Sequence, residues 1–162
     1  AMGLAMVTVV GQCVGAGDYA QARRYNRKLM LISWLLIAAS VAAILASLPL
    51  LLNLYNISDE ARVLSAQLVR LHNIPAVALW CLSFTLPNTL RAAGDARFTM
   101  VVSIASMAVF RIGFSVVLGI WMGLGAIGVW IAMDIDWVCR VICFVARYFS
   151  GAWTRKYQNY QA

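Results

Sequence analysis

Four long apolar stretches dominate this chain of 162 residues. They cover residues 29–52, 63–87, 98–122 and 124–148, and each is 24 or 25 residues long. A transmembrane α-helix needs about 20 predominantly apolar residues. Within lipid, only helices and closed barrels satisfy every backbone hydrogen bond, and these stretches lack the alternating pattern of barrel strands. The sequence therefore predicts an all-α fold, a polytopic bundle of transmembrane helices.

The two ends of the chain differ from these stretches. Residues 1–14 are apolar but too short to span a bilayer, and they begin within a hydrophobic pattern. We expect them to be the end of a truncated helix, and the chain to be a fragment of a longer protein. Residues 149–162 are more polar and are expected to form a cytoplasmic tail.

A formal net charge of +7 leaves two interpretations open, a nucleic-acid partner or the basic cytoplasmic loops of a membrane protein. Lys and Arg gather in a predicted loop at 15–28, in a turn at 91–97 and near the C-terminus. The connections at 53–62 and 122–124 carry no such excess. This alternation predicts a multi-pass protein of the inner (plasma) membrane with a cytoplasmic C-terminus, a lipid bilayer as its partner and no nucleic acid.

One short turn sequence occurs twice, in the basic segments at 15–28 and 91–97. Both copies contain Ala-Gly-Asp, and the residues of interest are Gly15, Gly17 and Asp18 in the first and Arg91, Gly94 and Asp95 in the second. Glycine permits the left-handed backbone of a helix C-terminus. We therefore expect these turns to shape the connections and fix the threading, without touching a transported solute.

The second stretch contains the largest polar cluster, and it is followed by Pro75. The cluster consists of Gln67, Arg70, His72 and Asn73. Polar residues beside a proline kink are typical of a water-filled cavity or a substrate site within a membrane. The alternative is a helix that begins only near Leu71, which would leave these residues at the membrane interface. Both interpretations stay open at this point.

Apart from Arg147 near the end of the last stretch, four charged residues lie inside the last two stretches, namely Arg111, Asp134, Asp136 and Arg140. Arg111 and Asp134 are each about 11 residues, roughly 17 Å, from the hairpin tip near Met122, so they lie at the same depth. We expect an ion pair between them, and a second one between Asp136 and Arg140, which share a helix face. Structural neutralisation is favoured over a role as proton or ion relay.

No catalytic motif is found, so an enzyme is not expected. The four cysteines, Cys13, Cys81, Cys139 and Cys143, all lie in apolar segments without further metal ligands nearby. They are expected to be packing residues. We predict no metal site and no cofactor.

Three segments together resemble multidrug and toxic compound extrusion (MATE) transporters. The first two are the segments from Gly11 to Arg23 and from Pro87 to Phe98, which contain the Ala-Gly-Asp turns. The third begins with Phe110-Arg111-Ile112-Gly113 and continues from Gly123 to Arg140. The resemblance covers essentially the whole chain, and the order and spacing of the motifs make it specific.

The resemblance implies the C-terminal part of a twelve-helix transporter, from the end of helix eight through helix twelve. Such a transporter has two six-helix lobes around a central cavity, so the missing N-terminal lobe would be a partner of this segment. It exports small organic, often cationic, compounds in exchange for Na⁺ or H⁺. The family places some coupling acids in helix ten, but residues 63–87 contain none, so no coupling residue is carried over.

Two other functions remain open from the sequence. A related flippase for lipid-linked oligosaccharides has similar helices, and a cavity lined by many basic residues would favour it. A small, non-transporting membrane scaffold that packs against a partner is the third possibility. The isolated chain is expected to transport nothing, because alternating access needs two lobes.

Overall fold

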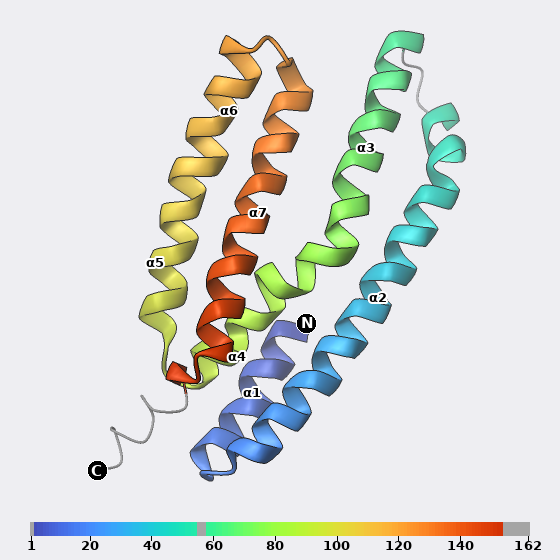
Figure 1. Ribbon diagram of the computed structural model, residues 1–162. Helices are drawn as coiled ribbons and strands as arrows, with labels where there is room; N and C mark the ends of the chain where they lie inside the picture. The colour runs from blue at the N-terminus through green and yellow to red at the C-terminus, as the bar shows by residue number, and fades with distance from the viewer. Residues whose placement is uncertain (1, 55–57, 154–162) are drawn as a thin grey trace.

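The computed structural model describes residues 2–54 and 58–153, and every regular element in these ranges is a helix (Figure 1). The α-helices are α1 (Met2–Gly15), α2 (Tyr19–Leu54), α3 (Asp59–Trp80), α4 (Leu86–Ala92), α5 (Ala96–Ser106), α6 (Phe114–Val116) and α7 (Gly125–Phe149). Three π-helical segments, η1 (Cys81–Thr85), η2 (Met107–Gly113) and η3 (Val117–Trp121), lie within the longer helices. The predicted all-α membrane bundle is confirmed.

Within residues 2–54 and 58–153, three continuous helices are long and apolar enough to cross a membrane. They comprise Tyr19–Leu54, Asp59–Ala92 and Ala96–Trp121. α7 also has sufficient length, 25 residues, but it contains four charged residues, Asp134, Asp136, Arg140 and Arg147. Its role as a fourth span stays a prediction. The first helix, α1, has 14 residues and is too short to span, as expected.

Successive long helices run in opposite directions (Figure 1). The turns at 16–18 and 93–95 lie at the same end of the bundle as the C-terminal end of α7. We call this the basic end. The end of α2, the start of α3 and the hairpin tip at 122–124 lie at the opposite end. This arrangement agrees with the order of connections that the charge pattern predicted.

The predicted loop at 15–28 is wrong, because only residues 16–18 separate α1 from α2. The Asp18 side chain accepts a hydrogen bond from the Gln21 amide at 2.8 Å, so it caps the first turn of α2. Arg and Lys are good helix formers and extend α2 beyond its apolar segment. Four basic residues, Arg23, Arg24, Arg27 and Lys28, therefore lie on α2 itself.

The second long helix is bent where α3 passes through η1 into α4 (Figure 1). Pro75 lies inside α3, and Pro87 begins α4. In η1 the Leu86 amide donates to the Cys81 carbonyl, five residues back, and Pro87 has no amide hydrogen to continue an α-helical ladder. A helix start near Leu71 is wrong, since α3 begins at Asp59 after the Ser58 cap.

The main core cluster packs the basic end of the bundle. It contains Met6, Val10, Val14, Ala22, Leu86, Leu90, Ala93, Phe144 and Trp153. Trp153 is 1% exposed, and its indole N–H donates to the Tyr148 carbonyl at 3.0 Å. The predicted tail at 149–162 begins later than expected, because Phe149 still belongs to α7 and Trp153 packs in the core. Residues 154–162 lie outside the described part of the chain.

Candidate functional site

A buried polar network joins α7 to the end of α5. Asp136 is fully buried and Arg140 is 8% exposed. The Arg140 Nε donates to Asp136 Oδ1 at 3.0 Å and to Ser106 Oγ at 2.9 Å. Ser106 Oγ donates to the same carboxylate oxygen. The predicted Asp136–Arg140 pair is thus present, with a serine partner that the sequence reasoning missed.

Further contacts hold the Arg140 guanidinium in place. One of its terminal nitrogens donates to the Ser103 carbonyl at 3.3 Å. The guanidinium also lies 5.7 Å from the centre of the Phe84 ring, which belongs to the π-helical η1. Asp136 Oδ2 is buried and has no hydrogen-bond partner among the described residues. The network therefore joins three helices.

The predicted ion pair between Arg111 and Asp134 is wrong. The two ion pairs within residues 2–54 and 58–153 are Asp136–Arg140 and Asp95–Arg147. The Asp134 Oδ1 atom is buried without a hydrogen-bond partner in that same part of the chain. Equal depth in the hairpin did not bring the two side chains together. Arg111 lies instead on η2, whose π-helical turn directs it differently from an α-helix.

His72 lies in an aromatic cluster formed by α3, η1 and α7. Its ring is 4.7 Å from Trp130 and 4.9 Å from Trp137, measured between ring centres. Trp137 also contacts Trp80 at 5.5 Å and Phe84 at 5.7 Å. The His72 Nδ1 and Trp137 Nε1 atoms are buried without partners among the described residues. The cluster thus combines apolar rings with unused polar atoms, the usual composition of a ligand site.

The other members of the predicted polar cluster point elsewhere. Arg70 lines a groove of about 390 Å³ between α2 and α3, together with Arg62. Gln67 lines a separate hollow with Asp59 and Glu60 at the start of α3. Asn73 donates to the Val69 carbonyl of its own helix at 2.8 Å. The four residues therefore do not form one site, and His72 alone joins the aromatic cluster.

The two Ala-Gly-Asp turns have the same backbone structure. Gly17 and Gly94 have φ angles of 76° and 81°, in the left-handed region. In each turn the glycine amide donates to a carbonyl three residues back and the aspartate amide to one five residues back. This is the Schellman pattern of a helix C-terminus, which requires glycine at that position. The predicted role of these residues in shaping the turn agrees with this geometry.

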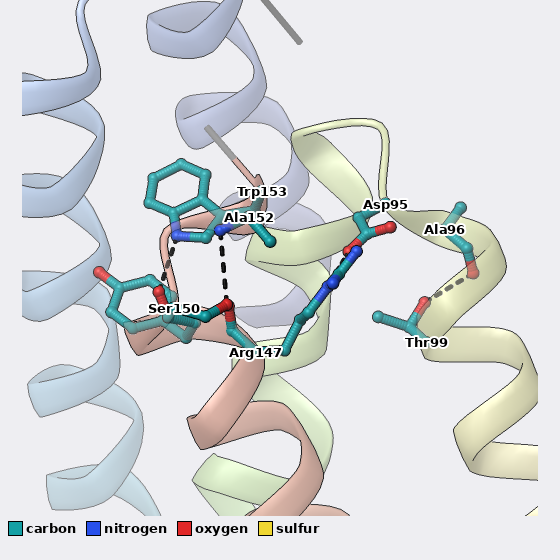
Figure 2. A network of polar contacts seen from close by, with 8 residues as sticks. Asp95, Ala96, Thr99, Arg147, Ser150, Ala152 and Trp153 are labelled. Carbon is teal, nitrogen blue, oxygen red and sulfur yellow. Dashed lines mark hydrogen bonds and ion pairs between the residues drawn. The ribbon is translucent and has the colours of Figure 1, made fainter. Parts of the chain in front are cut away.

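The two aspartates nevertheless have different partners. Asp18 caps α2, whereas the fully buried Asp95 accepts a hydrogen bond from Arg147 Nε of α7 at 2.7 Å (Figure 2). The Arg147 guanidinium also lies 4.7 Å from the centre of the Phe98 ring. In the sequence, Arg147 is one of the basic residues near the C-terminus whose charge pattern predicts the threading. Its position in the last turn of α7, at the same end as the Asp95 turn, was the available signal for this pair.

This difference between the turns predicts unequal effects of one substitution. Asp95→Asn should lower the free energy of unfolding by about 1–3 kcal/mol, because it removes a buried, charged hydrogen bond. Asp18→Asn should change it little, since asparagine also caps helices well. Urea unfolding of both variants in detergent, followed by helical circular dichroism, measures the difference. Equal losses in the two variants would contradict the assigned role of Arg147.

In the described part of the chain, no three His, Cys, Asp or Glu residues gather closely enough to hold a metal ion. The four cysteines are free thiols, of which Cys81 is buried in η1. Two polar features of the interior, the Asp136–Arg140 network and the aromatic cluster, meet at Phe84.

These features define a multi-pass α-helical membrane protein with polar groups held inside its bundle. Its family follows from comparison with known proteins. The family model for MatE matches residues 1–117, which is more than two thirds of the chain. The chain belongs to the MatE family.

Two curated relatives agree with this assignment. The "Uncharacterized transporter YisQ" of Bacillus subtilis (strain 168) is 27% identical over 150 residues, covering 91% of this chain and 32% of the relative. The "Multidrug and toxin extrusion protein 1" of Oryctolagus cuniculus is 23% identical over 150 residues, covering 93% of this chain and 26% of the relative. The chain thus spans a third or less of the length of these relatives. No solved structure matches it significantly.

Proposed function

We propose that this chain is the C-terminal part of a transporter that exports small organic, often cationic, compounds. Export would be coupled to the entry of Na⁺ or H⁺ through alternating access of two lobes. The second lobe would lie outside this chain. The observation that carries the proposal is the match of residues 1–117 to the MatE family. Similarity to a relative named for multidrug and toxin extrusion supports the substrate class.

The orientation is part of the same proposal. The basic end would face the cytoplasm, because Arg23, Arg24, Arg27 and Lys28 begin α2 there, and Arg91 and Arg97 flank the second turn. The C-terminal end of α7 lies at that end too (Figure 1). The membrane would be the plasma membrane, the inner membrane where a cell has two.

The interior of the bundle supports a substrate surface beside the bend of the second long helix. Interrupted helices at membrane depth often line transport sites, because their irregular backbone is tolerated only around a cavity or within protein. Here η1 interrupts the helix and carries Phe84 of the aromatic cluster. Aromatic ring faces attract organic cations. We propose that the cluster around His72 and Trp130 contacts the exported compound.

Transport by the complete reading frame tests this function. Everted vesicles should take up a fluorescent organic cation when a Na⁺ or H⁺ gradient is imposed, and the 162-residue chain alone should not. Trp130→Ala should weaken the apparent affinity roughly tenfold, through loss of one ring face. Trp121→Ala is the matched control, because this ring at the hairpin tip is 79% exposed.

Two outcomes would contradict the proposal. One is the absence of cation uptake under either gradient, in vesicles that contain the folded protein. The other is movement of a lipid-linked oligosaccharide in place of the cation, which would favour a flippase. Equal affinities of the two tryptophan variants would remove the aromatic cluster from the substrate pathway.

A further inference from the structure

A hollow of about 260 Å³ opens at the basic end, between the start of α2 and the end of α7. Its lining residues are Arg23, Asn26, Arg27, Tyr148, Phe149 and Gly151. Arg23, Asn26 and Arg27 follow the i, i+3, i+4 spacing, which places all three on one face of α2. Neither the polar network nor the aromatic cluster uses any of these residues.

A buried hydrogen-bond chain fixes the back wall of this hollow. Asn26 is 4% exposed, and its amide nitrogen donates to the Tyr148 hydroxyl at 3.0 Å. The Asn26 carbonyl oxygen accepts from Thr89 of α4 at 2.7 Å. Because the tyrosine oxygen is used as an acceptor, its own proton is free to donate into the hollow. Tyr148 is also stacked on Trp153, with ring centres 5.5 Å apart.

The hollow offers hydrogen-bond donors and positive charge. Its lining residues in the described part of the chain include no Asp or Glu. Asp18 is the acid nearest to Arg23 along the chain. Its side chain accepts a hydrogen bond from the Gln21 amide at the start of α2. Arg23 and Arg27 form no ion pair within the described residues, and the Arg23 guanidinium lies 5.9 Å from the centre of the Trp153 ring. Such a set of donors is suited to an anion.

Several carbonyl groups in the last turn of α7 already accept hydrogen bonds from the chain. Ser150 N–H donates to the Ala146 carbonyl at 3.0 Å, and Gly151 N–H to the Tyr148 carbonyl at 3.3 Å. The Trp153 indole donates to that Tyr148 carbonyl as well (Figure 2). These hydrogen bonds reduce the negative potential at the end of α7, beside the hollow.

The position along α2 indicates where the anion comes from. A helix of 36 residues is roughly 54 Å long, well beyond the ~30 Å hydrocarbon layer, so its first turns project from the bilayer. The apolar part of α2 begins at Leu29, directly after the hollow. Leu31, one turn after Arg27, is 57% exposed. The hollow is thus at headgroup depth, with apolar surface continuing toward the hydrocarbon.

We propose that this hollow binds the phosphate of an anionic phospholipid headgroup. Arg23 and Arg27 pair with the phosphate, the Tyr148 hydroxyl donates to it, and an acyl chain lies along Leu31. The bound phosphate links α2 to the end of α7 and so reinforces the basic end. That the lipid comes from the cytoplasmic leaflet rests on the proposed orientation.

Lipid retention by the purified protein, expressed from its complete reading frame, tests the site. Native mass spectrometry in detergent compares phosphatidylglycerol with phosphatidylcholine. The wild type should retain phosphatidylglycerol preferentially, and R23Q/R27Q should lose this retention about 10- to 30-fold. The control R24Q/R97Q removes the same charge from exposed residues at the same end, and it should change retention less than about twofold.

Two additional variants separate the site from a folding defect. Tyr148→Phe keeps the ring and its stacking but removes the hydroxyl, and it should weaken retention roughly threefold. R23K/R27K keeps the charge but lacks the planar guanidinium, and it should restore part of the loss seen with glutamine. Both should elute from a sizing column like the wild type.

Three results would overturn the proposal. They are equal losses in R23Q/R27Q and R24Q/R97Q, no preference for phosphatidylglycerol over phosphatidylcholine, and displacement of the lipid by equimolar glycerol 3-phosphate. The last would identify a site for soluble phosphate compounds. These outcomes do not depend on cation uptake, so failure of the lipid site and failure of the transport function are distinguishable.

Discussion

Replacing Asp136 with alanine should lower the free energy of unfolding by about 3–5 kcal/mol. The substitution leaves the Arg140 guanidinium, which is 8% exposed, without its counter-ion in the interior. Ser106 and the Ser103 carbonyl would remain its hydrogen-bond partners, but neither carries a charge. Thermal and urea unfolding of the purified protein in detergent, followed by helical circular dichroism, measures the loss.

The double variant D136L/R140M is the matched comparison. It replaces both charged residues with apolar side chains of similar size, so no unpaired charge remains. It should recover most of the stability that Asp136→Ala loses. A double variant as unstable as the single one would mean that the network contributes through its hydrogen bonds. A loss below about 1 kcal/mol for Asp136→Ala would show that water reaches Arg140.

Gly128→Ala should destabilise the hairpin of η3 and α7 by about 1–3 kcal/mol, in spite of the higher helix propensity of alanine. A Cβ at this position would lie 2.7 Å from the backbone carbon and oxygen of Leu118 and 2.9 Å from the Gly119 nitrogen. Backbone atoms cannot turn aside as a flexible side chain can. The two helices must therefore move apart, and contacts along the hairpin are lost.

Gly113→Ala serves as the control for this prediction. The nearest atom that its Cβ would meet is the Ala108 carbonyl oxygen at 3.9 Å, an ordinary contact. This variant should be as stable as the wild type, or slightly more stable. The same unfolding measurement compares the two. If the two alanine variants had the same free energy of unfolding, close packing at Gly128 would not contribute to the stability of the hairpin.

Local features of the sequence predicted much of this fold. The four apolar stretches lie within the helices of the structure, apart from Met122 and Leu124, and the hairpin tip falls at residues 122–124 as expected. The Asp136–Arg140 pair and the two glycine turns were also predictable. The ion pair and the two turns depend on residues within five positions of one another, where helix and turn geometry fix the distances.

The error at Arg111 and Asp134 has an identifiable cause. Distance from the hairpin tip determines depth, but contact also requires the two side chains to face each other around their helix axes. Between the tip and Arg111 the chain passes through η3 and into η2, and π-helical turns hold more residues than α-helical ones. The direction of Arg111 therefore departs from that of a regular helix. Sequence spacing does not reveal π-helical segments.

The polar cluster of the second stretch illustrates the same limit. Gln67, Arg70, His72 and Asn73 are close in sequence, yet a helix directs them to different sides. Which side becomes interior depends on where α2 and α7 pack against α3. His72 meets α7 through Trp130 and Trp137. Residues that are close in sequence are therefore separated in the structure. His72 joins the aromatic cluster, and the other three lie at different positions.

The sequence by itself determined that this is a helical membrane bundle, where its helices turn, and that it resembles the MatE family. These properties follow from hydrophobic length, from charge at the helix ends and from backbone chemistry, all of which act over short distances. The tertiary structure alone decided that Asp95 pairs with Arg147, 52 residues away, and Ser106 with Asp136, 30 residues away. Such pairs depend on the rotation and packing of whole helices, which no short segment of sequence specifies.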